Sequence, residues 1–484
     1  MADLKTMTSA ELRAELERKR NVVPIRPGAS APAFSEEAMA LFFGQIQEGK
    51  LRYIPAWNQW KIWDSQRWAH DEKLFSLDSV REICRQTAML YAEVTKGPGG
   101  PKGMASSKTA NGVLSLARSD RRLVAAAGDW DTQDYLLNTP GGTVDLTTMQ
   151  VRPHDPADYL TKITAVAPGG DCPMWKAFLK TVTKDDDDLT GYLQRVCGYS
   201  LTGDTREHAM FFGYGTGANG KSVLLTTVSG IIGDYHRATP IETFTATHND
   251  RHPTEIANLN GARLVTAVET EEGRRWAEAR IKALTGGDKI SARFMRQDLF
   301  EFLPRFKLFI AGNHKPGLRS VDEAIRRRFN LIPFAVTIAP ENRDSKLTEK
   351  LRVEWPGILQ WMLDGCRDWQ QGGLRPAKVV VAATDEYFST EDALATWIDE
   401  CCMKNVNAKT QVRPLFESWF LWSSKAGEYT GTEKNFSNTL EARGYQKSIK
   451  DGRRQFAGLE LKPAAVRTDQ DEPNYYRERY QGVS

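Results

Sequence analysis

The sequence predicts an α/β protein, and two observations carry that prediction. First, the stretch GYGTGANGKS at 213–222 lies between an apolar, aromatic segment typical of a buried strand and a segment with helical apolar spacing. Second, two further apolar runs, at 263–268 and 307–312, are typical of buried strands, and a polar residue follows each of them. Strands that alternate with helices in this way indicate an α/β domain.

The glycine-rich stretch fits the pattern G-x-x-x-x-G-K-[ST], with Gly215, Gly220, Lys221 and Ser222 in register. A strand, a glycine loop and a helix in this order direct backbone N–H groups and a positive helix end toward a phosphate. The alternative, a flexible glycine turn, requires four residue choices to coincide by chance. We therefore expect a phosphate-binding loop made of Gly215, Thr216, Gly217, Ala218, Asn219, Gly220, Lys221 and Ser222.

Composition limits the class of protein. With 484 residues, 40% hydrophobic and 26% charged, the chain predicts a globular protein of two to four domains. The net charge of +3 excludes a global basic field, so any nucleic acid must be bound by local patches. The six cysteines form no C-x-x-C pair, which predicts no zinc site and suits a reducing cytoplasm. No apolar run is long enough to span a membrane, and the N-terminus lacks a signal-peptide core.

Changes in pattern along the chain suggest six segments. An amphipathic helix and a Pro/Ala/Gly linker come first, and an α+β domain, the phosphate-binding domain, helices with a second linker, a basic C-terminal module and a tail follow. We place these segments at 1–33, 34–168, 169–340, 341–384, 385–470 and 471–484.

Two hairpins are expected in the second segment, at 57–72 and 136–155. The first carries Trp57, Trp60, Trp63 and Trp68, which could stack on nucleic-acid bases. Tryptophans in a hairpin more often form its core, and we favour that interpretation.

Hydrolysis of a nucleotide also needs a carboxylate for Mg²⁺ and a group that orients water. The apolar run at 263–268 ends at Glu269, and Glu271 and Glu272 follow; the alternative is a solvated acidic turn. Asn313, after the run at 307–312, could orient water against the terminal phosphate. The basic run at 326–328 could contact the nucleotide of a neighbouring subunit or form a solvated patch.

In this order, GTGANGKS, LVTAVETEE, KALTGGDKISARFMRQ, KLFIAGN and RRRFNLIPF resemble the motifs of superfamily 3 helicases. The series is most similar to the phage and plasmid primase–helicase branch, which is related to the poxvirus nucleoside triphosphatase. LLNTPGGTVDLTTMQVRPHDPADYLT resembles the domain that precedes the helicase in that branch, and the C-terminal module resembles its winged-helix domain. The resemblance covers most of 34–465.

The resemblance implies an AAA+-like parallel sheet around a P-loop and a hexameric ring with ATP sites between subunits. It also implies 3′-to-5′ movement on single-stranded DNA. By position, Lys221 and Ser222 would contact phosphate and Mg²⁺, with Glu269 as the metal carboxylate, Glu271 or Glu272 for the water and Asn313 as sensor. Arg328 best matches the arginine finger, and Arg327 is the second choice. The sequence departs from the family in having Thr270 after Glu269, where the family has an acidic pair.

Two stretches could bind DNA. The stretch at 289–309 predicts a hairpin, which in the family enters the ring channel, so Arg293 and Arg296 would contact DNA phosphates; the alternative is an ordinary surface hairpin. The stretch at 404–454 predicts two helices and a basic wing, a form that suits duplex or forked DNA, and the alternative is a basic oligomerisation module. The candidate wing residues are Lys447, Lys450, Arg453 and Arg454.

These expectations combine into an ATP- and Mg²⁺-dependent DNA helicase of phage, prophage or plasmid replication, in the cytoplasm of a bacterial or phage-infected cell. It would form a homo-oligomeric ring on single-stranded and forked DNA and could work with a separate primase or polymerase. We identify no Asp-x-Asp pair or cysteine cluster suited to polymerising chemistry, so we do not expect primase activity in the chain itself. The alternatives are an AAA+-like ATPase that remodels or loads replication proteins and an origin-binding ring protein that does not unwind.

Overall fold

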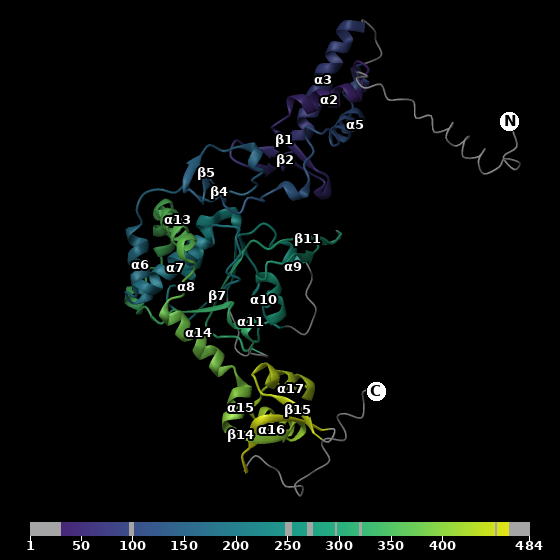
Figure 1. Cartoon of the computed structure of the whole chain (residues 1–484). Coiled ribbons are helices and arrows are strands. Elements are labelled where there is room, and N and C mark those ends of the chain that lie inside the picture. Colours follow the sequence, from purple (N-terminus) through teal and green to yellow (C-terminus); the bar gives the residue numbers. More distant parts are fainter. Residues whose placement is uncertain are drawn as a thin grey trace, which may run out of the picture. The chain divides into compact units, whose positions relative to one another are not determined.

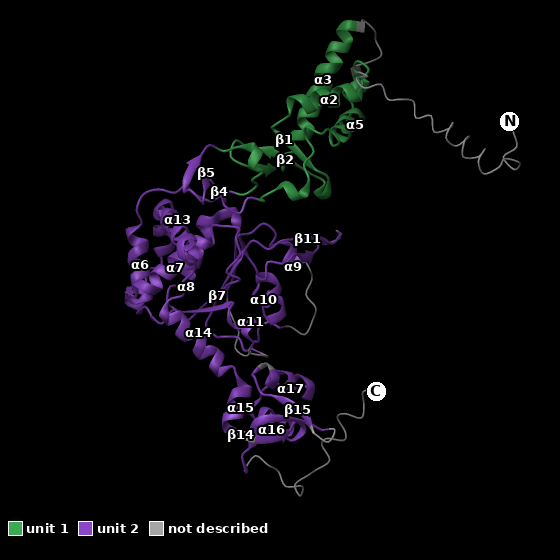
Figure 2. Ribbon diagram, in the orientation of Figure 1, with its two compact units in different colours: residues 1–132, 154–162 green, residues 133–153, 163–484 purple. Residues whose placement is uncertain are grey.

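The computed structural model describes residues 31–95, 101–246, 254–268, 274–295, 298–318, 322–450 and 453–463. The chain divides into two compact units, of residues 1–132 with 154–162 and of residues 133–153 with 163–484 (Figure 2). The predicted helix at 1–20 and the tail at 471–484 lie outside the described residues. Among the residues described, no helix is both long and apolar enough to cross a membrane.

The first unit packs helices against a three-stranded antiparallel sheet. Each longer helix begins beside a side-chain oxygen that accepts backbone N–H groups: Ser35 from Ala38, Ser106 from Thr109, and the Asp71 carboxylate from Phe75 and Ser76. The sheet order is β1 (Leu51–Ile54), β2 (Gln59–Trp63) and β3 (Trp68–His70). The helices are α2 (Glu36–Ile46), α3 (Phe75–Thr95), α4 (Pro101–Met104) and α5 (Ser107–Ala117).

The first predicted hairpin is confirmed, since β2 and β3 pair antiparallel across the predicted turn. Trp60 is buried among the residues that α2 and α5 cover, and Trp68 is buried on the other face of the sheet beside Trp130. Trp57, in contrast, is exposed, with 38% of its surface accessible to solvent. The core interpretation of Trp60 and Trp68 is therefore confirmed.

The second unit is built on a five-stranded sheet in which every pair of neighbouring strands is parallel. The α/β prediction is thus confirmed. The chain leaves β7 toward strands on one side of it and returns to form β13 on its other side, so the strand order reverses at β7. Ligands of open α/β sheets bind at the carboxyl ends of the strands near such a reversal. The sheet order is β13 (Phe329–Pro333), β7 (Met210–Tyr214), β12 (Lys307–Gly312), β9 (Leu264–Val268) and β8 (His236–Ala238).

Both faces of this sheet are buried, which explains the continuous apolar runs in the sequence. In β7, Phe211 lies in one core while Met210 and Phe212 lie in the other, and β12 alternates in the same way. The first core includes residues of α6 (Pro173–Thr183), α7 (Asp187–Tyr199) and α8 (Lys221–Ile232). The second includes residues of α10 (Glu278–Thr285), α11 (Glu323–Arg326) and α14 (Lys378–Thr390).

The second predicted hairpin is also confirmed, and a third strand follows it. Its strands are β4 (Leu136–Thr139), β5 (Gly142–Asp145) and β6 (Gln150–Arg152). The predicted boundary at 168 is wrong, however, because Leu137, Val144 and Leu146 are buried in the first core of the second unit. This hairpin therefore belongs with the parallel sheet.

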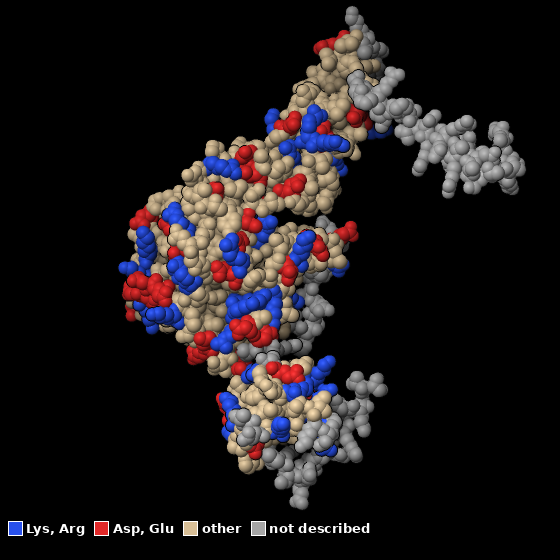
Figure 3. All heavy atoms as spheres, viewed as in Figure 1, with Lys and Arg blue, Asp and Glu red and all other residues tan. Residues whose placement is uncertain are grey.

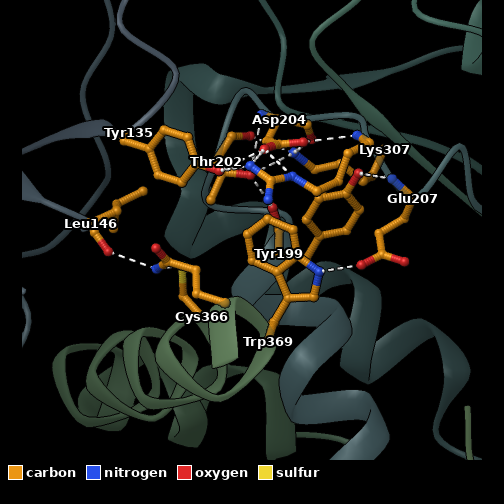
Figure 4. A network of polar contacts seen from close by, with 11 residues as sticks. Tyr135, Leu146, Tyr199, Thr202, Asp204, Glu207, Lys307, Cys366 and Trp369 are labelled. Carbon is orange, nitrogen blue, oxygen red and sulfur yellow. Dashed lines mark hydrogen bonds and ion pairs between the residues drawn. The ribbon is translucent and has the colours of Figure 1, made fainter. Parts of the chain in front are cut away.

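Buried polar contacts at the amino end of β12 fasten the hairpin in this place (Figure 4). The Lys307 ammonium is wholly buried, donates to the carbonyl oxygens of Thr202 and Asp204, and lies 4.5 Å from the centre of the Tyr199 ring. Tyr135, which precedes β4, donates its hydroxyl to the Asp204 carboxylate at 2.5 Å. Burial lowers the pKa of Lys307 well below its ordinary value. The segment from Thr202 to Asp204 therefore binds both Lys307 of the sheet and Tyr135 beside the hairpin.

The helices after the sheet correct two further boundaries. The expected lid at 341–384 is instead part of the core, because α13 (Trp355–Gly372) packs along α7 and buries Ile358, Met362 and Cys366 (Figure 1). Helix α12 (Leu347–Leu351) precedes it. The module expected from 385 begins later, since α14 continues to Thr390 and packs on β13.

The C-terminal module has its own core, which includes Trp397, Trp419 and Phe436. The two predicted helices and the predicted strand–turn–strand are confirmed as α16, α17, β15 and β16. A further strand, β14, completes an antiparallel sheet of order β14-β16-β15. The elements are α15 (Ala393–Cys401), β14 (Cys402–Gln411), α16 (Val412–Ala426), α17 (Glu433–Ala442), β15 (Lys447–Lys450) and β16 (Arg453–Leu461).

Candidate nucleotide site

The glycine loop joins the carboxyl end of β7 to the first residue of α8, as the sequence predicts. Gly217, Ala218 and Gly220 all have positive φ, at 97°, 49° and 87°. Left-handed residues among right-handed ones curve a backbone so that successive N–H groups face one concave side, a form that binds anions. The first amides of α8 have no partner within the helix, as in any helix, and they extend this donor surface.

The loop is held from the segment that follows β13. The buried side chain of Asn219 donates to the Phe334 carbonyl oxygen at 3.2 Å, and Ile338 N donates to the Ala218 carbonyl oxygen at 2.9 Å. A Cβ atom at Gly215 would lie 2.4 Å from the Phe334 carbonyl oxygen, so this close approach requires glycine. The sequence pattern located the loop but not this support.

Lys221 is the central side chain of the site. It is only 7% exposed, and its Nζ donates to the Gly215 carbonyl oxygen at 2.7 Å and to Asn313 Oδ1 at 3.3 Å. Burial lowers the pKa of this ammonium group. Asn313 directly follows β12, the neighbour of β7 in the sheet. Two residues that the sequence assigned to one site, 92 positions apart, are thus in contact.

The remaining loop residues present polar groups to solvent. Thr216, Ala218 and Ser222 are exposed, with Ser222 in the first turn of α8. A lysine ammonium, a serine hydroxyl and a row of amides form a donor set that fits a phosphate chain with its Mg²⁺. Glu269, Glu271 and Glu272 lie outside the described residues. The strand before them, β9, ends at Val268, which pairs with Ala311 of β12, two residues before Asn313.

The three arginines before β13 differ in their surroundings. Arg328 is buried, and it donates from Nε to Thr285 Oγ1 at 3.1 Å and from Nη1 to the Ala324 carbonyl oxygen at 2.5 Å. Burial lowers its pKa. Its guanidinium group is therefore engaged within its own subunit, and its predicted role in a neighbouring site stays a prediction.

Arg326 and Arg327 are both exposed. Arg326 Nη2 donates to Asp385 Oδ1 of α14 at 2.7 Å, so it is engaged in an ion pair. Arg327 lies between Arg326 and Arg328, both of which are held by side chains of other helices. Asp385 and Thr285 had no signal in the sequence, because these contacts join segments more than forty residues apart.

The predicted hairpin at 289–309 is confirmed: β10 (Ile290–Ala292) pairs antiparallel with β11 (Phe300–Phe302). Phe294 and Phe300 stack with ring centres 5.5 Å apart, and Arg293 is exposed beside them. Arg296, at the expected turn, lies outside the described residues.

On the face that Figure 3 shows, basic residues are not gathered in one band. The visible face carries Lys and Arg interspersed with Asp and Glu (Figure 3), in agreement with the small net charge. In the C-terminal module, Arg453 and Arg454 are exposed at the start of β16, and Lys447 forms an ion pair with Glu441 at 2.7 Å. Lys450 ends β15. No cluster of His, Cys, Asp and Glu suited to a metal ion occurs in the part of the chain that the structure describes.

Fold and site together define an α/β protein with a candidate phosphate-binding loop at the edge where its strand order reverses. Residues 38–184 match the family described as "D5 N terminal like", and residues 213–328 match a family of unknown function, DUF5906. The first segment is therefore similar to D5 N-terminal-like domains, and the second contains the glycine loop, Asn313 and Arg328.

Relatives of the chain include viral proteins named as helicases. A protein of Acanthamoeba polyphaga mimivirus, "Putative helicase L207/L206", is 26% identical over 328 residues, which are 62% of this chain and 34% of the relative. "Putative helicase 022R" of Frog virus 3 is 24% identical over 58% of this chain and 30% of the relative. The chain thus spans about a third of the length of these relatives. The D5 N-terminal-like match and these viral relatives confirm the resemblance to the primase–helicase branch.

Two solved structures of the C-terminal region of NrS-1, both in the apo form, align with most of the chain. One covers 84% of this chain and 85% of its own, with a TM-score of 0.48 at 11% identity. The other covers 87% and 99%, with a TM-score of 0.46 at 11% identity.

The packing around the loop predicts a difference between two of its glycines. A Cβ atom at Gly220 would lie 2.4 Å from Val182 Cγ1, whereas one at Gly217 would meet nothing within 4 Å. Both positions are left-handed, so either alanine costs about 1–2 kcal/mol in backbone strain. We expect Gly220→Ala to lose about 2–5 kcal/mol of unfolding free energy, because overpacking adds to that strain. Urea unfolding of both variants measures this, and equal losses would contradict it.

Proposed function

We propose that the chain is an ATP-hydrolysing DNA helicase whose nucleotide binds the glycine loop after β7. The observation that carries this proposal is the contact of Lys221 with Asn313 at the carboxyl ends of two adjacent parallel strands. A phosphate bound there would replace the Gly215 carbonyl oxygen as the partner of the Lys221 ammonium. The viral relatives named as helicases support the same function.

Each residue of the site then has a chemical role. Lys221 holds the terminal phosphates, and Asn313, already beside it, orients the attacking water. The Ser222 hydroxyl, with Glu269, would hold the Mg²⁺ that accompanies ATP, and this ion would supply positive charge to the phosphate oxygens. Glu271 or Glu272 would accept a proton from the water. These carboxylates follow β9, whose partner in the sheet is the strand that ends beside Asn313.

We further propose that the protein forms a ring, with a hexamer as the form that its motifs imply, and that Arg327 completes the site of a neighbouring subunit. Arg327 is exposed, whereas Arg328 is engaged with Thr285 and Ala324. A guanidinium group that is free to reach across an interface can neutralise charge that develops on the transferred phosphate.

DNA would be contacted at two places. The β10–β11 hairpin lies in sequence between β9 and β12, so a change at either candidate nucleotide-sensing strand end can move it without a long relay. The C-terminal module, with helices α16 and α17 and the β15–β16 wing, has the elements of a winged helix, and Arg453 and Arg454 of its wing are exposed for phosphates. We propose movement from 3′ to 5′ on single-stranded DNA because the resemblance to superfamily 3 helicases implies it.

Lys221→Ala should abolish ATP turnover while the fold remains. The stability of the nucleotide-free protein should change little, because the loss of two hydrogen bonds is offset by the removal of a desolvated charge. Lys307→Met is the matched control, since it removes a buried lysine at the opposite end of β12 and should lower stability but leave ATP turnover in the folded protein. Steady-state hydrolysis and thermal unfolding measure both. Turnover by Lys221→Ala at the parent rate would exclude the loop as the ATP site.

Arg327→Ala should keep stability and nucleotide binding but lower ATP turnover by about 10³-fold. Arg328→Ala should instead lose about 1–3 kcal/mol of unfolding free energy, because Thr285 and Ala324 lose their buried partner. Rings mixed from Arg327→Ala and Lys221→Ala subunits should regain part of the turnover, since some sites then combine an intact loop with an intact Arg327. No recovery in verified mixed rings would contradict the role of Arg327 between subunits.

Arg293→Ala combined with Arg296→Ala should keep basal ATP hydrolysis and lose its stimulation by single-stranded DNA. Each lost phosphate contact should lower the salt slope of DNA binding by about one. Arg81→Ala, which removes an exposed arginine of α3 in the first unit, is the control and should change neither quantity. Hydrolysis with and without DNA, and binding over a range of salt, test this prediction. If single-stranded DNA stimulated hydrolysis by the double variant as much as by the parent, the hairpin would not be the part that couples DNA binding to hydrolysis.

A further inference from the structure

The loop that follows β12 is fastened to α14 by side chains that the proposed reaction does not use. This loop, residues 313–318, is called the Asn313 loop below. The buried hydroxyl of Tyr387 donates to the Pro316 carbonyl oxygen and accepts from Trp276 Nε1 at 3.2 Å. One turn further along the chain, Glu391, the C-cap residue of α14, accepts from Leu318 N through Oε2 at 2.7 Å. A residue of α14 and its C-cap thus hold two points of one short loop.

The same loop is paired with the segment that follows the carboxylates after β9. Gly317 N donates to the Arg274 carbonyl oxygen at 2.8 Å, and Trp276 N donates to the Gly317 carbonyl oxygen at 2.9 Å. Because Trp276 also donates its indole N–H to Tyr387, this segment and the Asn313 loop meet at the same hydroxyl group. A shift of the segment after β9 or of the loop after β12 would therefore change a contact of the Tyr387 hydroxyl.

The other end of the Asn313 loop lies at the candidate nucleotide site. Asn313 accepts from Lys221, and the ammonium of Lys315 lies 4.1 Å from the centre of the Tyr214 ring, at the last residue of β7. The loop has only six residues and is tied at both ends. A movement of its backbone at Asn313 would therefore change the contacts that Tyr387 and Glu391 make with its other end.

Helix α14 also carries contacts to the edge strand and to the arginine segment. Thr384 Oγ1 accepts from Leu331 N of β13 at 3.1 Å, and Asp385 pairs with Arg326. These contacts lie within two turns of Tyr387 on a helix of 13 residues. Asp392, the N-cap of α15, follows Glu391 directly, and α15 is the first helix of the C-terminal module.

We propose that Tyr387 and Glu391 are positioning residues for the Asn313 loop, and that α14 passes movement of this loop to the C-terminal module at Asp392. This inference rests on the proposed ATP site, because it needs an event at Lys221 that moves Asn313. It adds a route by which the state of the nucleotide changes the part of the chain proposed to hold DNA. No intermediate element is needed, since the loop's anchor, Glu391, and the module's first cap, Asp392, are consecutive residues.

Tyr387→Phe tests both parts of the proposal. Removing the hydroxyl frees the Pro316 carbonyl oxygen and the Trp276 indole while the ring keeps its packing. A displaced Asn313 misaligns the attacking water but leaves the Lys221 contact to phosphate, so we expect kcat to fall by about 10- to 100-fold with little change in KM for ATP. The parent should show altered amide hydrogen exchange in 384–401 when a non-hydrolysable ATP analogue binds, and Tyr387→Phe should lose that response.

Two further variants separate positioning from general loss of stability. Tyr192→Phe removes another buried tyrosine hydroxyl, bonded to Asn330 at 2.9 Å, and should leave kcat and the exchange response at the parent level. Glu391→Gln keeps an acceptor for Leu318 N and removes only the charge, so it should fall between the parent and Tyr387→Phe.

The outcomes distinguish this inference from the proposed function. An analogue that binds the parent and changes exchange at 313–318 but not at 384–401 would overturn the coupling and leave the ATP site intact. Parent-level kcat and exchange response in Tyr387→Phe, or equal losses in Tyr192→Phe, would overturn the positioning roles. Failure of the parent to bind the analogue would overturn the proposed ATP site, and the inference with it.

Discussion

The contact of one ammonium group, that of Lys221, with the Gly215 carbonyl oxygen and the Asn313 amide is the interaction around which the second unit is arranged. It requires β7 and β12 to be adjacent and parallel, so that a loop and a strand end far apart in sequence meet at one edge. It also requires a loop that curves back over the lysine, which positive φ at Gly217 and Gly220 permits. Among the described residues no carboxylate is bonded to Lys221, a desolvated cation is costly to bury, and the proposed phosphate ligand would offset this cost.

The sequence was sufficient where local pattern decides structure. Apolar runs predicted the buried strands, because both faces of the sheet are covered, and the glycine pattern predicted the loop at the end of β7. Asn313 could be named because a polar residue directly after a buried strand lies at the edge of the sheet. The two hairpins and the C-terminal helices followed from turn residues and periodicity. The resemblance to helicases agrees with the viral relatives, although the chain spans only about a third of their length.

The sequence was insufficient where contacts between distant segments decide structure. Nothing in the triplet at 326–328 distinguishes a buried arginine from an exposed one. Thr285 and Asp385, on helices far along the chain, make that distinction. The hairpin at 136–152 looked like part of the preceding domain because nothing local shows that Leu137 and Val144 pack in the core of the next unit. Tyr387 was missed for the same reason: its hydroxyl acts on the Asn313 loop across 71 positions.

These contacts join the candidate nucleotide site, the arginine segment and α14, so the proposed hydrolysis at Lys221 would act on all three. The most direct test of that account is strand displacement on forked DNA with a 3′ or a 5′ single-stranded tail, measured with and without ATP. The account predicts unwinding of the 3′-tailed fork only when ATP is present, and none by a protein whose ATP hydrolysis is abolished. Hydrolysis of ATP and binding of DNA without unwinding of either fork would contradict it and would indicate an ATPase that remodels other replication proteins.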